Sequence, residues 1–312
     1  MSMDLLSESI KGRLLFAIPK KGRLHEKCLE ILAGADIKFI RSHRLDVCLV
    51  LNHNIALVFL PAADIPRFVG LGNVDLGITG QDVILEAQME NRVQQVLPLG
   101  FGRCNLQVQV PERGPIKSLQ DLAGKRVVTS FNRIASGFFD KIDAEVGLQG
   151  DKKTHIDYVG GSVEAACALG LADGIVDLVE SGETMRAAGL HAIATVLETE
   201  AVLISGVSSD SQPKNPEHGP LAKLITNRIA GVLAANKYVI CQYNILESKL
   251  PEAKLITPGR RAPTISPLVG EVEKWVAVSV MVEKKIIAKV MDDLTGIGAH
   301  DVFVVKLENC RV

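Results

Sequence analysis

The strongest chemical signal in the chain is a short polar loop, Ser181-Gly182-Glu183-Thr184, which follows an apolar run at Ile175–Val179 and precedes a helical pattern. A loop that leads from a strand into a helix exposes successive main-chain N–H groups at the positive end of that helix. Two hydroxyls add further donors, and the glycine lets an anion approach the main chain closely. These features predict a cradle for a phosphate group. Asp177 would repel a phosphate, so its expected partner is a pair of sugar hydroxyls or a metal ion.

A simpler explanation exists for each of these features. A Ser-Gly-x-Thr turn often only caps a helix, and taken alone it is more often a cap than a phosphate site. The basic residues Lys20, Lys21 and Arg23 follow the apolar run Leu14–Pro19, at the end of a strand where ligands bind in parallel sheets. An isolated basic run, however, is more often a solvated surface. The residue types alone leave both alternatives open.

Short apolar runs alternate with helical patterns over the first two hundred residues, which is typical of parallel α/β layers. Before Pro111 we expect strands at 14–19, 55–60 and 74–78, and helices at 22–34, 64–70 and from 81. After it we expect strands at 126–129, 156–159 and 175–179, and helices at 118–122, 134–146, 163–171 and from 184. Two similar groups of elements predict two lobes with a ligand cleft between them.

The last third of the chain has a different order of elements. A polar loop at 208–219 precedes an amphipathic helix at 221–235. The elements over 238–307 then run strand, helix, strand, strand, helix, strand, the ferredoxin-like order. The predicted fold is therefore a two-lobed α/β core, like that of periplasmic binding proteins, with a C-terminal ferredoxin-like (ACT-like) domain. We expect the first lobe at 1–110 with a return segment at 200–230, the second lobe at 111–199, and the C-terminal domain at 231–312.

The composition argues against several classes of function. The net charge is −1 and aromatic residues make up 4%, so neither a basic surface nor a base-stacking platform for nucleic acid is expected. No apolar run reaches the roughly 18 residues that span a membrane, and the N-terminus lacks an apolar signal core. The six cysteines form no CxxC pair, and the histidines, including His25 and His43, show no HExxH spacing. We expect a cytoplasmic protein with no nucleic-acid or membrane partner and no metal site built from protein ligands alone.

The loop and its surroundings resemble the signature of a known enzyme family. The matching residues are Glu164, Gly170, Ala172, Ile175, Asp177, Leu178, Ser181, Gly182, Thr184 and Met185. The segments IPKKGRL, RLD, ADIP, VDLGITGQD, GSVEA and TPGRRAPTISPL match as well, so the resemblance covers essentially the whole chain. The sequence is similar to the long form of the ATP phosphoribosyltransferase family, the first enzyme of histidine biosynthesis. The residues of the matching segments are most similar to those of the fungal members.

The resemblance implies a reaction and a cofactor. The 5′-phosphate of phosphoribosyl pyrophosphate would lie on Ser181, Gly182, Glu183 and Thr184, with the ribose hydroxyls at Asp177 and Glu164. Adenine N1 of ATP would attack the ribose C1, giving N1-(5-phosphoribosyl)-ATP and pyrophosphate. Because the transition state resembles an oxocarbenium ion, catalysis would depend on aligning the substrates and neutralising the leaving pyrophosphate. Mg²⁺ is the implied cofactor, held mainly by substrate oxygens and water.

The resemblance also assigns roles in the first lobe. It implies that Lys21, Arg23 and Arg44 are catalytic, and that ATP contacts Lys21, Arg23, Asp75 and Gly80, near Gln81 and Asp82. For Asp75, a turn-capping role is an equally good expectation. Many family members carry an arginine where this chain has Pro61. One cationic contact is therefore missing or comes from elsewhere, with Arg67 and Arg103 as candidates.

For the C-terminal domain, the resemblance implies inhibition by L-histidine and assembly into a hexamer. The implied effector residues are Asn244, Arg260, Thr264 and Asp301, although 259–264 is also explained as a plain Pro/Gly turn. Two alternatives remain for the whole chain. A non-catalytic two-lobed binding protein should carry a secretion signal, and an inactive regulatory subunit should have lost the polar loop or Asp177.

Overall fold

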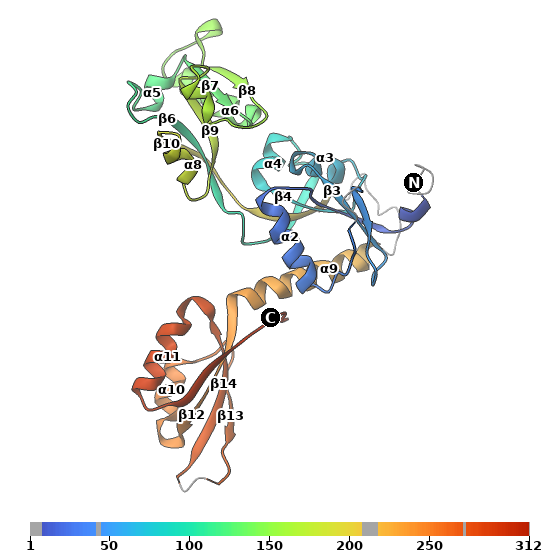
Figure 1. The fold of residues 1–312 in the computed structure, drawn as a ribbon, viewed down its shortest axis with the longest axis vertical. Helices are drawn as coiled ribbons and strands as arrows, with labels where there is room; N and C mark the ends of the chain where they lie inside the picture. Colours follow the sequence, from blue (N-terminus) through green and yellow to red (C-terminus); the bar gives the residue numbers. More distant parts are fainter. Residues whose placement is uncertain (1–7, 42–44, 208–217, 271–272, 312) are drawn as a thin grey trace. The chain divides into compact units, whose positions relative to one another are not determined.

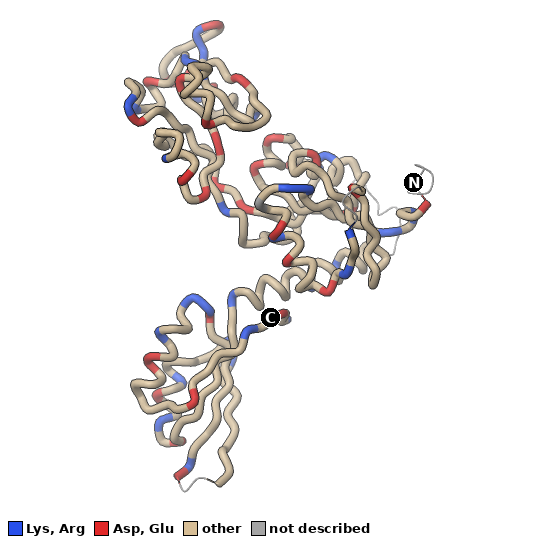
Figure 2. The backbone as a smooth tube through the Cα atoms, in the orientation of Figure 1, with Lys and Arg blue, Asp and Glu red and all other residues tan. Residues whose placement is uncertain are grey.

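The computed structural model describes residues 8–41, 45–207, 218–270 and 273–311, and it divides into two compact units (Figure 1). The first unit comprises Met1–Leu29 and Phe39–Ala222, and the second comprises Glu30–Lys38 and Lys223–Val312. Basic and acidic residues are interspersed along both units (Figure 2), in keeping with the net charge of −1. No helix in the described part of the chain is long and apolar enough to cross a membrane.

The first unit contains a six-stranded mixed sheet in the order β2-β3-β1-β4-β11-β5. Its strands are β1 (Leu14–Pro19), β2 (Val47–Leu49), β3 (Ile55–Leu60), β4 (Leu76–Gly80), β5 (Val93–Pro98) and β11 (Ala201–Gly206). The three central strands β3, β1 and β4 are parallel, whereas β2 and β11 run antiparallel to their neighbours. The predicted strands at 14–19 and 55–60 are confirmed, and they are almost fully buried because helices cover the sheet. The strand expected at 74–78 begins two residues later.

Helices connect the parallel strands of this sheet. They are α2 (Arg23–Gly34), the short η1 (Ala62–Asp64) leading into α3 (Ile65–Gly70), and α4 (Gln81–Glu86). Each connecting segment begins at the carboxyl end of a parallel strand, so the loops after β1, β3 and β4 meet at one edge of the sheet. The main-chain N–H of Lys20 donates to the carbonyl of Leu60 at 2.7 Å, which holds two of these loops together.

A second sheet in the same unit has the order β10-β6-β9-β7-β8. Its strands are β6 (Cys104–Pro111), β7 (Arg126–Thr129), β8 (His155–Tyr158), β9 (Gly174–Val179) and β10 (Leu190–Thr199). Its helices are α5 (Leu119–Leu122), α6 (Asn132–Glu145), η2 (Gly150–Lys152), α7 (Ala165–Ala168) and α8 (Glu183–Ala187). The boundary that we predicted after residue 110 falls too late, because β6 pairs with β9 and β10 in this second sheet.

The chain crosses between the two sheets twice. The first crossing lies between β5 and β6 and the second between β10 and β11, with Arg103 and Glu200 paired at 3.3 Å where the two crossings meet. The lobes also touch at Glu86, whose carboxylate accepts hydrogen bonds from the main-chain N–H groups of Arg133 and Ile134 at 2.9 and 3.0 Å. The predicted two-lobed α/β core is therefore confirmed.

The second unit consists of most of helix α9 (His218–Lys237) and a four-stranded antiparallel sheet in the order β13-β14-β12-β15. The elements are β12 (Tyr238–Leu246), η3 (Glu247–Lys249), α10 (Leu250–Ile256), β13 (Thr264–Pro267), β14 (Trp275–Glu283), η4 (Lys284–Ile286), α11 (Ile287–Gly296) and β15 (His300–Lys306). Both helices pack on one face of the sheet (Figure 1), where alternate residues of β12 and β14 are buried. The ferredoxin-like prediction is confirmed. The unit starts at Lys223 rather than 231 and also includes Glu30–Lys38.

Candidate active site

The loop between β9 and α8 is shaped by a glycine. Gly182 has a φ of +75°, a left-handed conformation that other residues adopt only with strain, and it forms the N-cap of α8. A Cβ at this position would lie 2.7 Å from Nη1 of Arg186. The helix begins at Glu183, one residue earlier than we expected, so Thr184 is the second residue of its first turn.

The hydrogen bonds of the loop show which of its polar groups cap the helix and which do not. The hydroxyl of Ser181 accepts a 3.3 Å bond from the main-chain N–H of Glu183, so the capping explanation is partly correct. Arg186 donates from Nη2 to the carbonyl of Ser181 at 3.0 Å. Within the described residues, the main-chain N–H groups of Gly182, Thr184 and Met185 have no acceptor. Three donors therefore remain for an anion.

A cavity of about 180 Å³ opens beside this loop. It is lined by Gln109, Glu164, Asp177, Leu178, Val179, Glu180, Ser181, Gly182, Glu183, Thr184 and Met185. The structure thus brings together all six residues that the sequence assigned to phosphoribosyl pyrophosphate. Asp177 is half-buried and accepts a 2.8 Å bond from the N–H of Leu178, which fixes its carboxylate at the cavity wall.

Two residues that line the cavity, Gln109 and Glu180, and one that binds the loop, Arg186, were missed. Gln109 lies on β6, is 2% exposed, and donates to the carbonyl of Asp177 at 3.4 Å. The sequence signal for Gln109 was the alternation of apolar and polar residues along β6, which places Gln107 and Gln109 on the same face of the strand. Gln107 pairs with Asp177 on β9, so Gln109 lies one step further along that face. Glu180 and Arg186 flank the loop directly, and the only signal for them was their distance in sequence from Gly182.

The cavity is rich in carboxylates, from Glu164, Asp177, Glu180 and Glu183. In the described part of the chain, no three His, Cys, Asp or Glu side chains converge as ligands for a metal ion. Oxygen donors of this kind suit Mg²⁺, which keeps several water ligands and takes few bonds from protein. The residues present therefore fit an ion whose remaining ligands come from a phosphorylated substrate.

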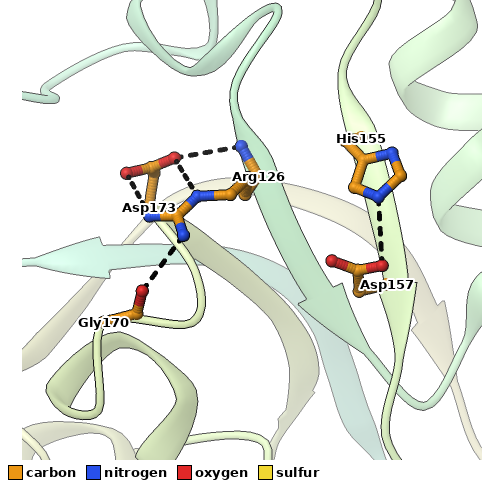
Figure 3. A network of polar contacts seen from close by, with 5 residues as sticks. All are labelled: Arg126, His155, Asp157, Gly170 and Asp173. Atoms are coloured by element: carbon orange, nitrogen blue, oxygen red, sulfur yellow. Dashed lines mark hydrogen bonds and ion pairs between the residues drawn. The ribbon is translucent and has the colours of Figure 1, made fainter.

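The position of β9 depends on an ion pair at the opposite end of the strand (Figure 3). Arg126, at the start of β7, donates from Nε to Asp173 at 3.3 Å and from Nη1 to the carbonyl of Gly170 at 3.1 Å. The main-chain N–H of Arg126 also donates to the Asp173 carboxylate at 3.0 Å. Burial raises the pKa of Asp173, but the hydrogen bonds and charge of Arg126 outweigh it, so the pKa lies below its ordinary value. This contact fixes the segment that leads into β9.

Of the site residues predicted in the first lobe, the structure brings only some to the carboxyl edge of the sheet. Lys21 follows β1 and is exposed, and Gly80 ends β4, so both lie at the carboxyl edge of the parallel strands. Lys20 forms an ion pair with Asp46 at 2.8 Å. Arg23 is the first residue of α2, and its side chain lies outside the described residues. Arg44 falls at a position that the structure does not describe.

Asp75, which we predicted to bind ATP, does not lie at that edge. Asp75 precedes β4 and lies about 16 Å from Gly80 along the strand, at the opposite end. Its carboxylate accepts a 2.7 Å bond from the N–H of Leu15 and lies 3.1 Å from Nδ1 of the buried His218. The carboxylate of Asp82 also has a partner within the protein, because its Oδ1 accepts a 2.8 Å hydrogen bond from the hydroxyl of Thr199. Both carboxylates are structural contacts.

The four residues predicted to bind histidine do not form one pocket within this chain. Asn244 donates from Nδ2 to Asp301 at 2.9 Å, so these two are together. The guanidinium of Arg260 instead lies 5.5 Å from the ring of Tyr238, about 20 Å from Asn244 along β12. Thr264 is exposed on the edge strand β13, opposite Ser279.

Comparison with known proteins follows the same division. A family model described as ATP phosphoribosyltransferase matches residues 61–231, and one described as HisG, C-terminal domain, matches residues 235–309. The ATP phosphoribosyltransferase of Yarrowia lipolytica is 57% identical over 310 residues, which cover 99% of this chain and 100% of the relative. The protein of the same name from Saccharomyces cerevisiae is 52% identical over 311 residues, with the same coverage.

The fold is also similar to that of solved structures. An ATP phosphoribosyl transferase (HisG:HisZ) complex from Thermotoga maritima contains a chain that matches with a TM-score of 0.55 and 24% identity, covering 70% of this chain and 98% of that one. Because one family model matches residues 61–231, another matches 235–309, and relatives more than half identical cover 99% of its length, this chain belongs to the ATP phosphoribosyltransferase family, in its long form with the HisG C-terminal domain.

Proposed function

We propose that the cavity beside the loop between β9 and α8 binds phosphoribosyl pyrophosphate. The 5′-phosphate would accept hydrogen bonds from the main-chain N–H groups of Gly182, Thr184 and Met185, which lack acceptors among the described residues. The hydroxyl of Thr184 would add a further donor. Asp177 and Glu164, on the same cavity wall, would accept hydrogen bonds from the ribose hydroxyls. The observation that carries this proposal is that three residues lining a cavity of about 180 Å³ have main-chain N–H groups without an acceptor in the described part of the chain.

ATP would bind at the carboxyl edge of the first sheet, with its phosphates near Lys21, Arg23 and Arg44 and its base placed past Gly80. Adenine N1 would attack the ribose C1, the bond from C1 to the pyrophosphate oxygen would break, and pyrophosphate would leave with that electron pair. The protein would contribute alignment and positive charge rather than a nucleophile. When bound, Mg²⁺ supplies charge neutralisation to the leaving pyrophosphate. The four cavity carboxylates would accept hydrogen bonds from water around it.

The remaining parts of the proposal concern regulation, assembly and location. L-Histidine would inhibit through the C-terminal domain, where the contact between Asn244 and Asp301 offers polar groups for an amino acid. Because Arg260 and Thr264 lie elsewhere on the same domain, a pocket containing all four requires a second copy of the chain, in keeping with a hexamer. The six cysteines are all free thiols, which favours a reducing compartment such as the cytoplasm.

The activity is tested by mixing the purified chain with ATP, phosphoribosyl pyrophosphate and Mg²⁺ and following the change in adenine absorbance. Pyrophosphatase is added to remove the product pyrophosphate and draw the reaction forward. We expect a steady rate that falls when L-histidine is added. No product would remove the enzymatic assignment, whereas a rate indifferent to histidine would remove only the regulatory one.

Replacing both loop hydroxyls tests where the sugar phosphate binds. In the double variant Ser181→Ala with Thr184→Ala, we expect the KM for phosphoribosyl pyrophosphate to rise about tenfold or more, because hydrogen bonds to a charged group contribute roughly 1.5–3 kcal/mol. The KM for ATP should change less than twofold. Ser118→Ala, which removes the cap of α5 in the same lobe, is the matched control and should leave both KM values unchanged. An equal rise for both substrates would place the phosphate elsewhere.

A further inference from the structure

Arg41 lies in an unusual environment at the carboxyl edge of the first sheet. Its guanidinium stacks on the ring of Phe59, 3.7 Å from the centroid, and its Nη1 lies 3.4 Å from Nε2 of His25. Nδ1 of the same imidazole is 2.7 Å from the carbonyl of Pro19, which can only accept a hydrogen bond. Nδ1 therefore carries the proton, and Nε2 is left to accept from Arg41.

The contacts of Arg41 place it at the carboxyl ends of the parallel strands, where ligands bind in such sheets. Pro19 is the last residue of β1, Phe59 is the penultimate residue of β3, and His25 lies in the first turn of α2. All three contacts are thus at the sheet edge where Lys21 and Gly80 also lie. The half-buried guanidinium sits beside the positive end of a twelve-residue helix, where a second positive charge is unfavourable.

The charge of Arg41 has no counter-ion within the described residues. No carboxylate there pairs with it, and its Nε is buried without a hydrogen-bond partner. The next three residues in sequence, Ser42, His43 and Arg44, contain no acid, and the nearest acid along the chain, Asp46, pairs with Lys20. A partly buried guanidinium that lacks an anion is costly, and the environment favours an anionic ligand.

We propose that Arg41 is a substrate-binding residue that pairs with a phosphate group bound at the carboxyl edge of the first sheet. This rests on the proposed function, and the phosphate belongs either to ATP or to the pyrophosphoryl group of phosphoribosyl pyrophosphate. The planar guanidinium presents a fork of donors that matches two phosphate oxygens. The two arginines considered above are less suited, because Arg103 already pairs with Glu200 and Arg67 is exposed within α3. Arg41 thus supplies the cation that Pro61 does not.

The test compares Arg41→Gln, which keeps the first part of the aliphatic side chain and a polar end but removes the charge, with wild type in the full chain. The matched control is Arg92→Gln, an exposed arginine just before β5, at the opposite edge of the same sheet. The KM values for ATP and phosphoribosyl pyrophosphate are measured, together with the Kd of inorganic pyrophosphate by calorimetry. Thermal unfolding reports the stability of each variant.

We expect Arg41→Gln to raise at least one of these constants fivefold or more, with Arg92→Gln unchanged. A rise confined to ATP identifies an ATP phosphate, and a parallel rise for phosphoribosyl pyrophosphate and pyrophosphate identifies the leaving group. Changes below fivefold in all three, with or without a lower Tm, would overturn the proposal, because they leave Arg41 only a structural role.

If Arg41→Gln does not fold, Arg41→Lys decides, since it keeps the charge but loses the fork. A threefold or larger rise in one constant supports the proposal, and smaller changes in all three overturn it. An inactive wild type would contradict the proposed function instead, and the Kd of pyrophosphate for wild type and variants would still decide the role of Arg41.

Discussion

Gly182 shows how one residue type can determine the conformation of a loop. Its left-handed φ turns the main chain into the first turn of α8, whose residues line the cavity, while the hydroxyl of Ser181 accepts a hydrogen bond from the main-chain N–H of Glu183. A side chain here would meet Arg186, which is bound to the carbonyl of Ser181. The conformation of the loop and its open donors therefore have the same origin.

Gly182→Ala should impair substrate binding more than stability. An alanine in the left-handed region costs roughly 1–2 kcal/mol, and relief of that strain would turn the free N–H groups away from the phosphate. We expect a KM for phosphoribosyl pyrophosphate at least tenfold higher and a free energy of unfolding lower by about 1 kcal/mol, measured by steady-state kinetics and urea unfolding.

Gly137→Ala is the matched control for this substitution. Gly137 lies inside α6 with open space where a Cβ would be, so alanine should stabilise the protein by about 0.5–1 kcal/mol and leave the KM unchanged. A Gly182→Ala variant with the KM of wild type would show that the loop conformation does not matter for binding.

The residues of the cavity were more predictable than those of the first lobe. The pocket residues from Asp177 to Thr184 are consecutive in sequence, so one strand and one turn place them together. The motif that contains Asp75 does not show which of its residues lie at the ligand end of the strand. The pairing of β4 with β1 places Asp75 at the other end. The sequence did not single out Arg41 as a site residue, because its environment is formed by Phe59 and His25, which are distant in sequence and close in space.

At the scale of elements, the ion pair between Arg126 and Asp173 holds the start of β7 against the segment entering β9. The lowered pKa of Asp173 means that its ionised form is favoured in the folded protein. Its contribution to stability is therefore full above the unfolded pKa, about 3.9, and is lost as the pH falls through the folded pKa.

Asp173→Asn should lower the free energy of unfolding by about 1 kcal/mol at pH 7, a modest figure because the pair is partly exposed. The difference from wild type should shrink as the pH falls below about 4, as measured by urea unfolding across pH. Asp140→Asn, which breaks the exposed pair with Lys153, is the control and should have a smaller effect. A difference between Asp173→Asn and wild type that is independent of pH would contradict the ionic explanation.

Elements with local signals were predicted, and those fixed by distant pairing were not. The short helix expected at 118–122 is confirmed as α5, whose capping box joins Ser118 and Asp121. Strand β10 was missed because Ala192, Ala194 and Leu197 favour a helix by themselves. Pairing with β6 along its whole length, from Leu190 opposite Pro111 to Thr199 opposite Cys104, overrides that preference.

At the scale of the whole molecule, the order of elements was predictable because each class of fold has its own order. The run from β12 to β15 reads strand, helix, strand, strand, helix, strand, and its sheet order follows. The limits of the units were harder to predict. The segment Glu30–Lys38 joins the second unit, since the carbonyl of Gly34 accepts a hydrogen bond from Asn309 and that of Ala35 accepts one from Arg228. Such contacts join residues far apart in sequence.

The central claim is that the main-chain N–H groups of the loop after β9 hold the sugar's 5′-phosphate. A crystal structure of the full chain with phosphoribosyl pyrophosphate and Mg²⁺ tests it most directly. The account predicts phosphate oxygens at roughly 2.7–3.2 Å from the N atoms of Gly182, Thr184 and Met185, with the ribose hydroxyls at Asp177. A sugar diphosphate bound elsewhere, with those three N–H groups facing only water, would contradict it.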